Sequence, residues 1–252
     1  MIGSEAADRV INVIQPAKKP ARPGFDKRAI LQNHPIFGGL GAELLDRLSS
    51  YAISQTVKSG TTIFARGDPG TSLFAVCSGT VKISAPSPGG RDAVFNLIME
   101  GAIFGEIAVL DGLPRSADAT AITDCSLMII ERRHFISLVH ERPEFALQLI
   151  AVLCGRLRRT TEQLEDVMFL DLPGRLAKTL LQLAEQSEPN PQGRKIALTQ
   201  RDIGDMIGMT RESTNKQLRT WKKQKWIKLE RGGIVIVAPE ALARIASCVS
   251  GS

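Results

Sequence analysis

The stretch from Phe104 to Ala117, FGEIAVLDGLPRSA, constrains the fold of this chain more than any other segment. Gly105 precedes a short apolar run, Ile107–Leu110, which suits a single helical turn rather than a full core helix. The first N–H groups of such a turn, including those of Ile107 and Ala108, have no partner inside it, and the helix dipole adds to their attraction for an anion. We therefore expect an anion-binding site here.

Three polar side chains flank this turn. Arg115 follows Gly105 by ten residues and carries a permanently charged guanidinium that suits a phosphate. Ser116 adds a hydroxyl donor beside it. A phosphate alone would repel the carboxylate of Glu106, so Glu106 needs a donor from the same ligand, and a sugar hydroxyl is the natural candidate. The pattern indicates a small ligand with one phosphate and one ribose.

The segment resembles the phosphate-binding cassette of cyclic-nucleotide-binding domains. The matching residues are Gly105, Glu106, Arg115, Ser116 and Ala117. The chain is on this basis similar to the cyclic AMP receptor protein/fumarate-nitrate regulator superfamily, and most similar to its cyclic AMP branch. The resemblance implies that the Gly-Glu and Arg-Ser pairs hold a cyclic phosphate and its ribose. Cyclic AMP (cAMP) is the implied allosteric effector and cyclic GMP (cGMP) the alternative, because a hydroxyl at Ser116 is compatible with both.

The region from Ala52 to about Ile130 alternates short apolar strands with glycine-marked turns, which predicts an antiparallel roll or barrel. Its segment IFARGDPGTSLFAVCSGTVKI also resembles the early strands of the cyclic-nucleotide fold. Residues 25 to about 50 have apolar residues at helical spacing, broken by proline and glycine, and predict short helices. His34 in this region has no partner motif, which favours a packing or solvated role.

Residues 133 to 171 predict a helix with a hinge at Pro143. A seam at alternating three- and four-residue spacing follows the hinge: Ile150, Leu153, Leu157, Thr160, Leu164 and Val167. Such a seam favours a parallel homodimer, with packing on the chain's own roll as the alternative. The family resemblance implies that Thr160 reaches the adenine of its own subunit's ligand and that Thr161 reaches it from the partner subunit.

Two short helices are predicted near the C-terminus. Thr199 caps the first, Gly208 ends it and Thr210 caps the second, so the pair forms a helix-turn-helix. Two strands around Arg231-Gly232 predict a wing. Eight Lys or Arg and two Glu lie between Arg211 and Arg231, which favours duplex DNA over the alternative of a solvated basic face.

The first residues of the second helix are expected to meet base edges. Arg211 is a candidate for guanine and Glu212 for cytosine, and both match the base-reading positions of the family. Lys216 stands where the cyclic AMP branch carries arginine, and lysine cannot make the same fork. The full set of candidate DNA-binding residues is Thr199, Arg211, Glu212, Ser213, Asn215, Lys216 and Arg219. Thr199, Ser213 and the remaining basic residues of this region are expected at phosphates. Two-fold symmetry predicts a near-palindromic site with half-sites about one helical turn apart.

The expected fold class is α+β, with an N-terminal cyclic-nucleotide-binding antiparallel β-roll, a long dimerisation helix and a C-terminal winged helix-turn-helix. The expected domains are a flexible extension (1–24), which includes a short helix around residues 7–14, the β-roll domain (25–140), the dimerisation helix and hinge (141–171) and the DNA-binding domain (172–252). The expected protein is a cyclic-nucleotide-responsive transcription regulator. The alternative is a regulator of the same fold with a different effector or none.

Composition excludes several other classes. No apolar run of the 252 residues approaches 18, and the N-terminus lacks a signal-peptide core, so we expect a cytoplasmic protein without a membrane partner. The four cysteines are widely separated and show no metal spacing, and no catalytic motif is present, so neither a metal nor an enzyme is expected. The N-terminal extension lacks a cysteine cluster and the roll lacks histidine, which argues against iron–sulfur or haem sensing. RNA polymerase is an expected further partner.

Overall fold

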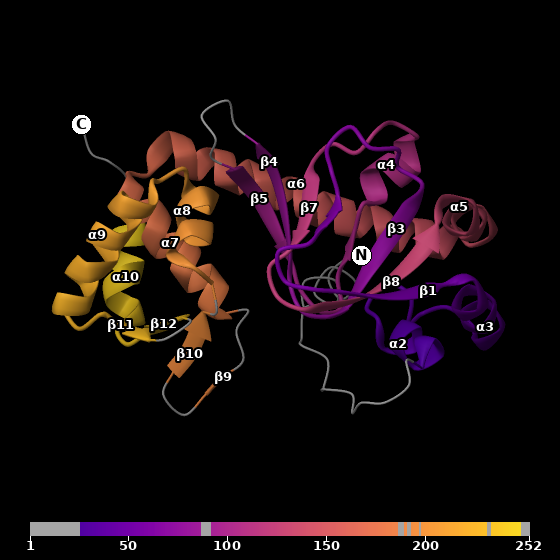
Figure 1. Cartoon of the computed structure of the whole chain (residues 1–252), viewed down its shortest axis with the longest axis horizontal. Helices are drawn as coiled ribbons and strands as arrows, with labels where there is room; N and C mark the ends of the chain where they lie inside the picture. Colours follow the sequence, from indigo (N-terminus) through magenta and orange to yellow (C-terminus); the bar gives the residue numbers. More distant parts are fainter. Residues whose placement is uncertain are drawn as a thin grey trace, which may run out of the picture. The chain divides into compact units, whose positions relative to one another are not determined.

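The computed structural model describes residues 26–86, 92–185, 189–190, 193–196, 198–230 and 233–247. The predicted extension (1–24), its short helix and the turn at residues 231–232 lie outside these residues. The chain divides into two compact units, residues 1–85 with 96–156 and residues 86–95 with 157–252. Each unit is described separately below, and Figure 1 gives the labels of their elements.

Short helices and two sheets make up the first unit. Its elements are α2 (Lys27–Asn33), α3 (Ala42–Tyr51), β1 (Ile53–Val57), β2 (Thr62–Phe64), β3 (Ser72–Ser78), β4 (Val81–Pro86), β6 (Ile103–Phe104), α4 (Glu106–Asp111), β7 (Asp118–Ala121), β8 (Cys125–Glu131) and α5 (Arg132–Glu141). Strand β5 (Asp92–Ile98) is divided between the two units after residue 95. The strand orders are β1-β8-β3-β6 and β2-β7-β4-β5. β8 pairs antiparallel with β1 and β3, and β7 does so with β2 and β4. The predicted antiparallel roll is confirmed.

Strand β3 is buried on both faces, with four consecutive buried residues from Leu73 to Val76. Successive side chains on a strand point to opposite faces. Accordingly Phe74 and Val76 join the core inside the roll, while Leu73 and Ala75 join a second core under α2, α3 and α5. The strand therefore contributes side chains to two apolar cores, and the core inside the roll lies next to the cassette.

Two helices follow the roll. α5 ends at Glu141, and α6 (Pro143–Phe169) begins at the proline that was predicted as a hinge. Proline is tolerated in the first turn of a helix, because its missing N–H would have no partner there. The same reason explains α7 (Leu172–Glu185), which includes Pro173 in its first turn.

Helices and a small sheet make up the second unit. Its elements after α6 are α7, β9 (Pro189–Asn190), β10 (Gly193–Ile196), α8 (Gln200–Ile207), α9 (Arg211–Lys223), β11 (Ile227–Glu230), β12 (Gly233–Ile236) and α10 (Pro239–Ala246). The sheet has the order β11-β12-β10-β9, so β9 and β10 extend the predicted wing. In the part of the chain described, no helix is both long and apolar enough to cross a membrane.

Candidate functional sites

The cassette begins at a glycine whose backbone no other residue adopts easily. Gly105 has φ +79° and directly precedes α4, and Gly112 ends that helix with φ +76°. A Cβ on Gly105 would lie 2.7 Å from Nη1 of Arg115. Glycine is therefore required here both for the left-handed backbone and for the close approach of the arginine.

Arg115 is buried, with 4% of its surface exposed. Its guanidinium donates to the carbonyl oxygens of Gly105 at 2.8 Å and Ser72 at 2.6 Å, and its Cζ lies 4.2 Å from the ring centroid of Phe64. Burial lowers the pKa of this guanidinium, while the nearby Asp68 and Glu106 act in the opposite direction. Within the described residues, no carboxylate forms an ion pair with it and its buried Nε has no hydrogen-bond partner. A buried cation without a paired anion is costly, so this position favours an anionic ligand.

Glu106 is also buried, at 2% exposed, but it has a partner within the chain. Arg156 of α6 pairs with its carboxylate and also donates to the carbonyl oxygen of Ile103. From the sequence we expected a ligand hydroxyl as the donor to Glu106, and Arg156 was not identified. Arg156 precedes the predicted ligand residue Thr160 by four residues, so both lie on one helix face. This spacing could have identified Arg156 as a site residue from the sequence.

The loop between β2 and β3 holds the cassette in place. In this β2–β3 loop, the carbonyl oxygen of Asp68 accepts from the N–H of Arg115 at 2.8 Å, and the N–H of Gly67 donates to the carbonyl oxygen of Arg115 at 2.9 Å. A Cβ on Gly70 would lie only 2.2 Å from Cβ of Ala108. The loop and α4 are thus in contact along the side of the cassette.

The remaining predicted ligand residues differ in exposure. Ala108 is buried, whereas Ile107 and Ser116 are exposed on the cassette. The structure thus brings Gly105, Glu106 and Arg115 together with the turn that carries Ile107 and Ala108. Thr160 and Thr161 are exposed on the part of α6 that belongs to the second unit, so their role in ligand binding stays a prediction.

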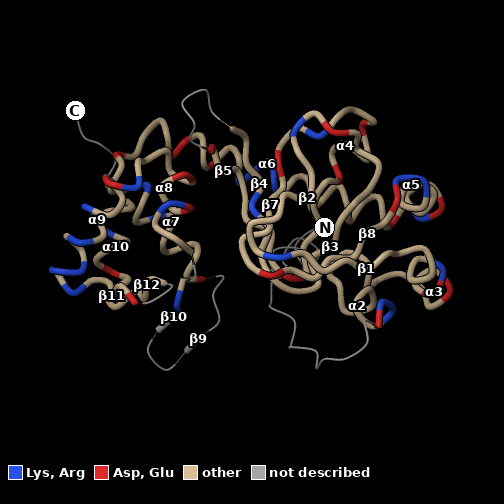
Figure 2. The backbone as a smooth tube through the Cα atoms, in the orientation of Figure 1, with Lys and Arg blue, Asp and Glu red and all other residues tan. Residues whose placement is uncertain are grey.

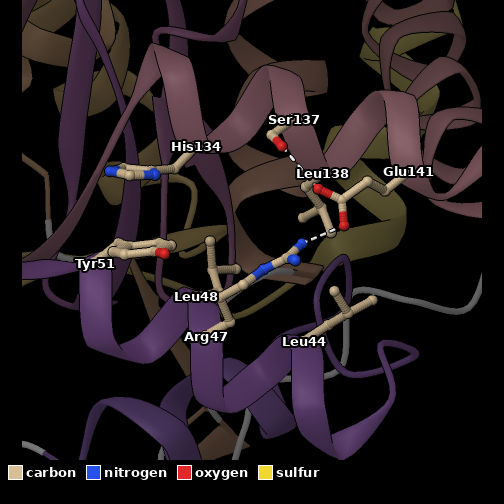
Figure 3. Close-up of a pocket in the computed structure, with 8 residues that line it drawn as sticks. All are labelled: Leu44, Arg47, Leu48, Tyr51, His134, Ser137, Leu138 and Glu141. Carbon is tan, nitrogen blue, oxygen red and sulfur yellow. Dashed lines mark hydrogen bonds and ion pairs between the residues drawn. The ribbon is translucent and has the colours of Figure 1, made fainter.

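A separate pocket of about 130 Å³ lies between α3 and α5 of the first unit (Figure 3). The rings of Tyr51 and His134 stack at its edge, with centroids 3.9 Å apart. Arg47 and Ser137 both donate to Glu141. These hydrogen bonds lower the pKa of the Glu141 carboxyl, and the one from Arg47 has the larger effect. Because these charged groups already pair with each other, we assign no ligand to this pocket.

The helix-turn-helix is built as predicted. Thr199 caps α8, and its hydroxyl accepts from the N–H of Asp202 at 3.1 Å. Gly208 ends α8 with φ +72°, and the hydroxyl of Thr210 accepts from the N–H of Ser213 at the start of α9. A Cβ on Gly204 would lie 2.8 Å from Oγ1 of the buried Thr214. The two helices therefore cross closely at a glycine.

The outer face of α9 carries the predicted DNA-binding residues. Thr214, Leu218 and Trp221 are buried, so the opposite side faces solvent. The exposed predicted residues are Arg211, Glu212, Ser213, Lys216 and Arg219, while Asn215 is half-buried. Figure 2 shows Lys and Arg along this helix. In the described part of the chain, the basic residues of α9 form no ion pair. They are thus available to a polyanion.

A β-roll with a phosphate-type cassette and a winged helix-turn-helix together define a ligand-responsive DNA-binding regulator. The cyclic nucleotide-binding domain model matches residues 54–142, and the Crp-like helix-turn-helix domain model matches residues 174–245. The chain belongs to the cyclic AMP receptor protein/fumarate-nitrate regulator family. It is therefore a transcription regulator with a cyclic-nucleotide-binding domain and a DNA-binding domain, and not an enzyme.

Two curated relatives match this chain over nearly their whole length. The "CRP-like cAMP-activated global transcriptional regulator" of Mycobacterium tuberculosis is 37% identical over 218 residues, which cover 85% of this chain and 97% of the relative. The "Cyclic AMP receptor protein" of Thermus thermophilus is 29% identical over 216 residues, which cover 86% and 98%.

Solved structures show the same fold. A transcriptional regulator of the CRP family from Thermus thermophilus has a TM-score of 0.68 at 24% identity, covering 78% of this chain and 98% of its own. The c-di-GMP responsive global regulator CLP of Xanthomonas campestris has a TM-score of 0.69 at 23% identity, covering 78% and 99%. The predicted α+β fold is confirmed.

Proposed function

We propose that this chain binds cAMP at the cassette and, as a homodimer, then binds a near-palindromic DNA operator. In this proposal Arg115 holds the cyclic phosphate together with Ser116 and the N–H groups of Ile107 and Ala108. Glu106, held in place by Arg156, accepts from the ribose hydroxyl. Thr160 and Thr161 contact the base, as the family resemblance implies.

The observation that carries the proposal is the buried, unpaired guanidinium of Arg115. Two carbonyl oxygens and an aromatic ring hold it, but carbonyl dipoles do not neutralise its charge. A cyclic phosphate carries a single negative charge and would compensate one guanidinium. The names of the relatives from Mycobacterium tuberculosis and Thermus thermophilus both refer to cAMP, which supports this effector over cGMP.

The homodimer is supported by the surface of α6. Four residues of the predicted seam are large, apolar and exposed: Ile150, Leu157, Leu164 and Val167. Leu153 instead packs against the core of the first unit, so the seam is only partly covered by its own subunit. A second copy of α6 would bury the exposed residues, and a two-fold dimer would place two α9 helices on successive major grooves.

The operator can be determined by selection from a randomised duplex library with and without cAMP. We expect enrichment of two inverted half-sites about one helical turn apart, and only when cAMP is present. No enrichment under either condition would contradict the proposal. Equal enrichment without cAMP would instead favour the alternative of a regulator with a different effector or none.

The same selection tests the reading of one base. Arg211→Ala should relax the preference at a single position in each half-site and cost roughly 1–3 kcal/mol of binding free energy, because a bidentate contact with guanine is lost. Lys223→Ala is the matched control at the other end of α9, and it should weaken binding to all sequences alike. An unchanged preference profile for Arg211→Ala would remove that residue from the base-reading set.

A further inference from the structure

Helix α9 ends in a Schellman motif. The N–H of Trp226 donates to the carbonyl oxygen of Trp221 at 3.0 Å, and the N–H of Lys225 donates to that of Lys222 at 3.1 Å. The two tryptophan rings that flank the motif lie 6.4 Å apart, which supplies its apolar contact. Both hydrogen bonds and the contact match the pattern in which the residue after the helix cap takes a left-handed backbone, usually as glycine.

In this chain a lysine occupies that position. Lys225 has φ +62°, and among the described residues it is the one non-glycine with a positive φ, beside seven glycines. A side chain with a Cβ is disfavoured in this conformation, because the Cβ crowds the following carbonyl oxygen. Helices α4 and α8 of the same chain have glycine at their left-handed ends. The lysine is therefore retained at a conformational cost that glycine or asparagine would reduce.

The charge of Lys225 is not used within the described part of the chain. Its side chain is exposed and pairs with no carboxylate within the described part of the chain. Lys222 and Lys223 already supply positive charge to the last turn of α9, so the helix dipole does not require a third lysine. Lys225 thus continues the basic surface of α9 beyond the end of the helix.

We infer that Lys225 is a DNA phosphate-binding residue, whose strained backbone is kept because the ammonium group contacts the duplex. This inference rests on DNA binding by the helix-turn-helix. It predicts that stability and DNA affinity respond in opposite directions to one substitution. If Lys225 were tolerated by chance, its substitution would change the stability and leave DNA affinity unchanged. If the helix end needed this lysine, its substitution would destabilise the fold.

The test compares Lys225→Gly and Lys225→Asn with the unchanged full-length chain. Melting is followed by circular dichroism, and binding by fluorescence anisotropy with a labelled duplex of mixed sequence in a series of NaCl concentrations, all at saturating cAMP. Both variants should melt a few degrees higher and bind the duplex several-fold more weakly. The slope of log affinity against log salt should fall by about one unit for each bound copy of the lysine.

Two controls separate the charge from the backbone. Lys225→Arg should keep the affinity and the salt slope without a rise in melting temperature. Lys58→Asn makes the same change in net charge at an exposed lysine of the first unit, and it should leave the salt slope unchanged. Higher melting with unchanged DNA binding would overturn the inference, as would lower melting of Lys225→Gly and Lys225→Asn. Failure of the unchanged chain to bind any duplex would count against DNA binding itself.

Discussion

The buried polar side chains of this chain differ in whether the fold supplies them with a hydrogen-bond or ion-pair partner. In the described residues they are His34, Ser84, Glu106, Arg115 and Thr214. Glu106 has Arg156 as its partner, and Thr214 donates to the carbonyl oxygen of Thr210 at 3.0 Å. Arg115 alone among the two buried charges has no counter-ion in the described chain. A fold that keeps such a group favours a state in which a ligand supplies the missing charge.

His34 should make the first unit sensitive to acid. It is 4% exposed, and its Nδ1 accepts from the N–H of Ile36 at 3.2 Å, so a proton on Nδ1 would face another donor. Burial lowers the pKa of His34 to about 4. The neutral imidazole contributes at most about 3 kcal/mol to the free energy of unfolding, and this contribution is complete above pH ~6.5. It is lost as the pH falls toward ~4, because the unfolded chain then binds a proton that the folded chain does not.

Urea unfolding of the chain and of His34→Gln at several pH values measures this effect. The variant should lose less unfolding free energy between pH ~6.5 and ~4, because it removes one titrating group. NMR titration of the His34 ring gives an independent value. A ring that titrates near 6.5 would show that the side chain is not held in its neutral form.

Gly70→Ala should weaken nucleotide binding by displacing the helical turn that carries the N–H of Ala108. The added methyl would come within 2.2 Å of Cβ of Ala108, so α4 or the β2–β3 loop must move. We expect a loss of about 1–3 kcal/mol of stability and a lower affinity for cAMP by calorimetry. Gly155→Ala, where a Cβ meets open space, is the control. Wild-type affinity in Gly70→Ala would mean that the loop does not position the cassette.

Among the elements, α6 offers a direct test of the proposed homodimer. Leu157→Lys places a charge in the seam and should shift the chain to monomer at concentrations where the unchanged chain is dimeric. Glu162 is also exposed but lies on the face of the helix away from the seam. Glu162→Lys should therefore leave the dimer intact. Analytical ultracentrifugation distinguishes the two, and an unaffected dimer in Leu157→Lys would place the interface elsewhere.

The crossing of α8 and α9 depends on Gly204. A Cβ there would lie 2.8 Å from Oγ1 of Thr214 and 3.0 Å from the carbonyl oxygen of Met209. Gly204→Ala should destabilise the second unit by about 1–3 kcal/mol and weaken DNA binding, because the helices must separate. Gly155→Ala in α6 should have the opposite sign, a gain of roughly 0.5–1 kcal/mol, because alanine favours a helix. Thermal melting of both variants checks the pair.

Across the whole molecule, local patterns were predictable from the sequence and long-range contacts were not. The helix-turn-helix follows from caps at Thr199 and Thr210 and from Gly208, all within a few residues of the helices they limit. Glycine spacing and short apolar runs likewise predicted the roll. The start of α7 had no clear signal, because proline disfavours a helix interior but is accepted in a first turn, as Pro173 is here. Strand β9 has two residues and β10 has the sequence GRKI, so neither shows a run of apolar residues.

The candidate site shows the same division. Gly105 and Arg115 lie ten residues apart, and their pattern was visible in one segment. Arg156 is 50 residues from Glu106 in sequence, and Gly70 contacts Ala108 only because the fold brings the loop to α4. Residues whose role depends on a distant partner could not be assigned from a single sequence.

Calorimetric titration with cAMP of the unchanged chain and of Arg115→Ala decides whether Arg115 holds the nucleotide. We expect binding to the unchanged chain and none to Arg115→Ala, with a circular dichroism spectrum that shows the variant folded. Arg133→Ala removes an exposed arginine of α5 and should bind as the unchanged chain does. Undiminished affinity in Arg115→Ala would contradict the claim that this buried guanidinium holds the phosphate.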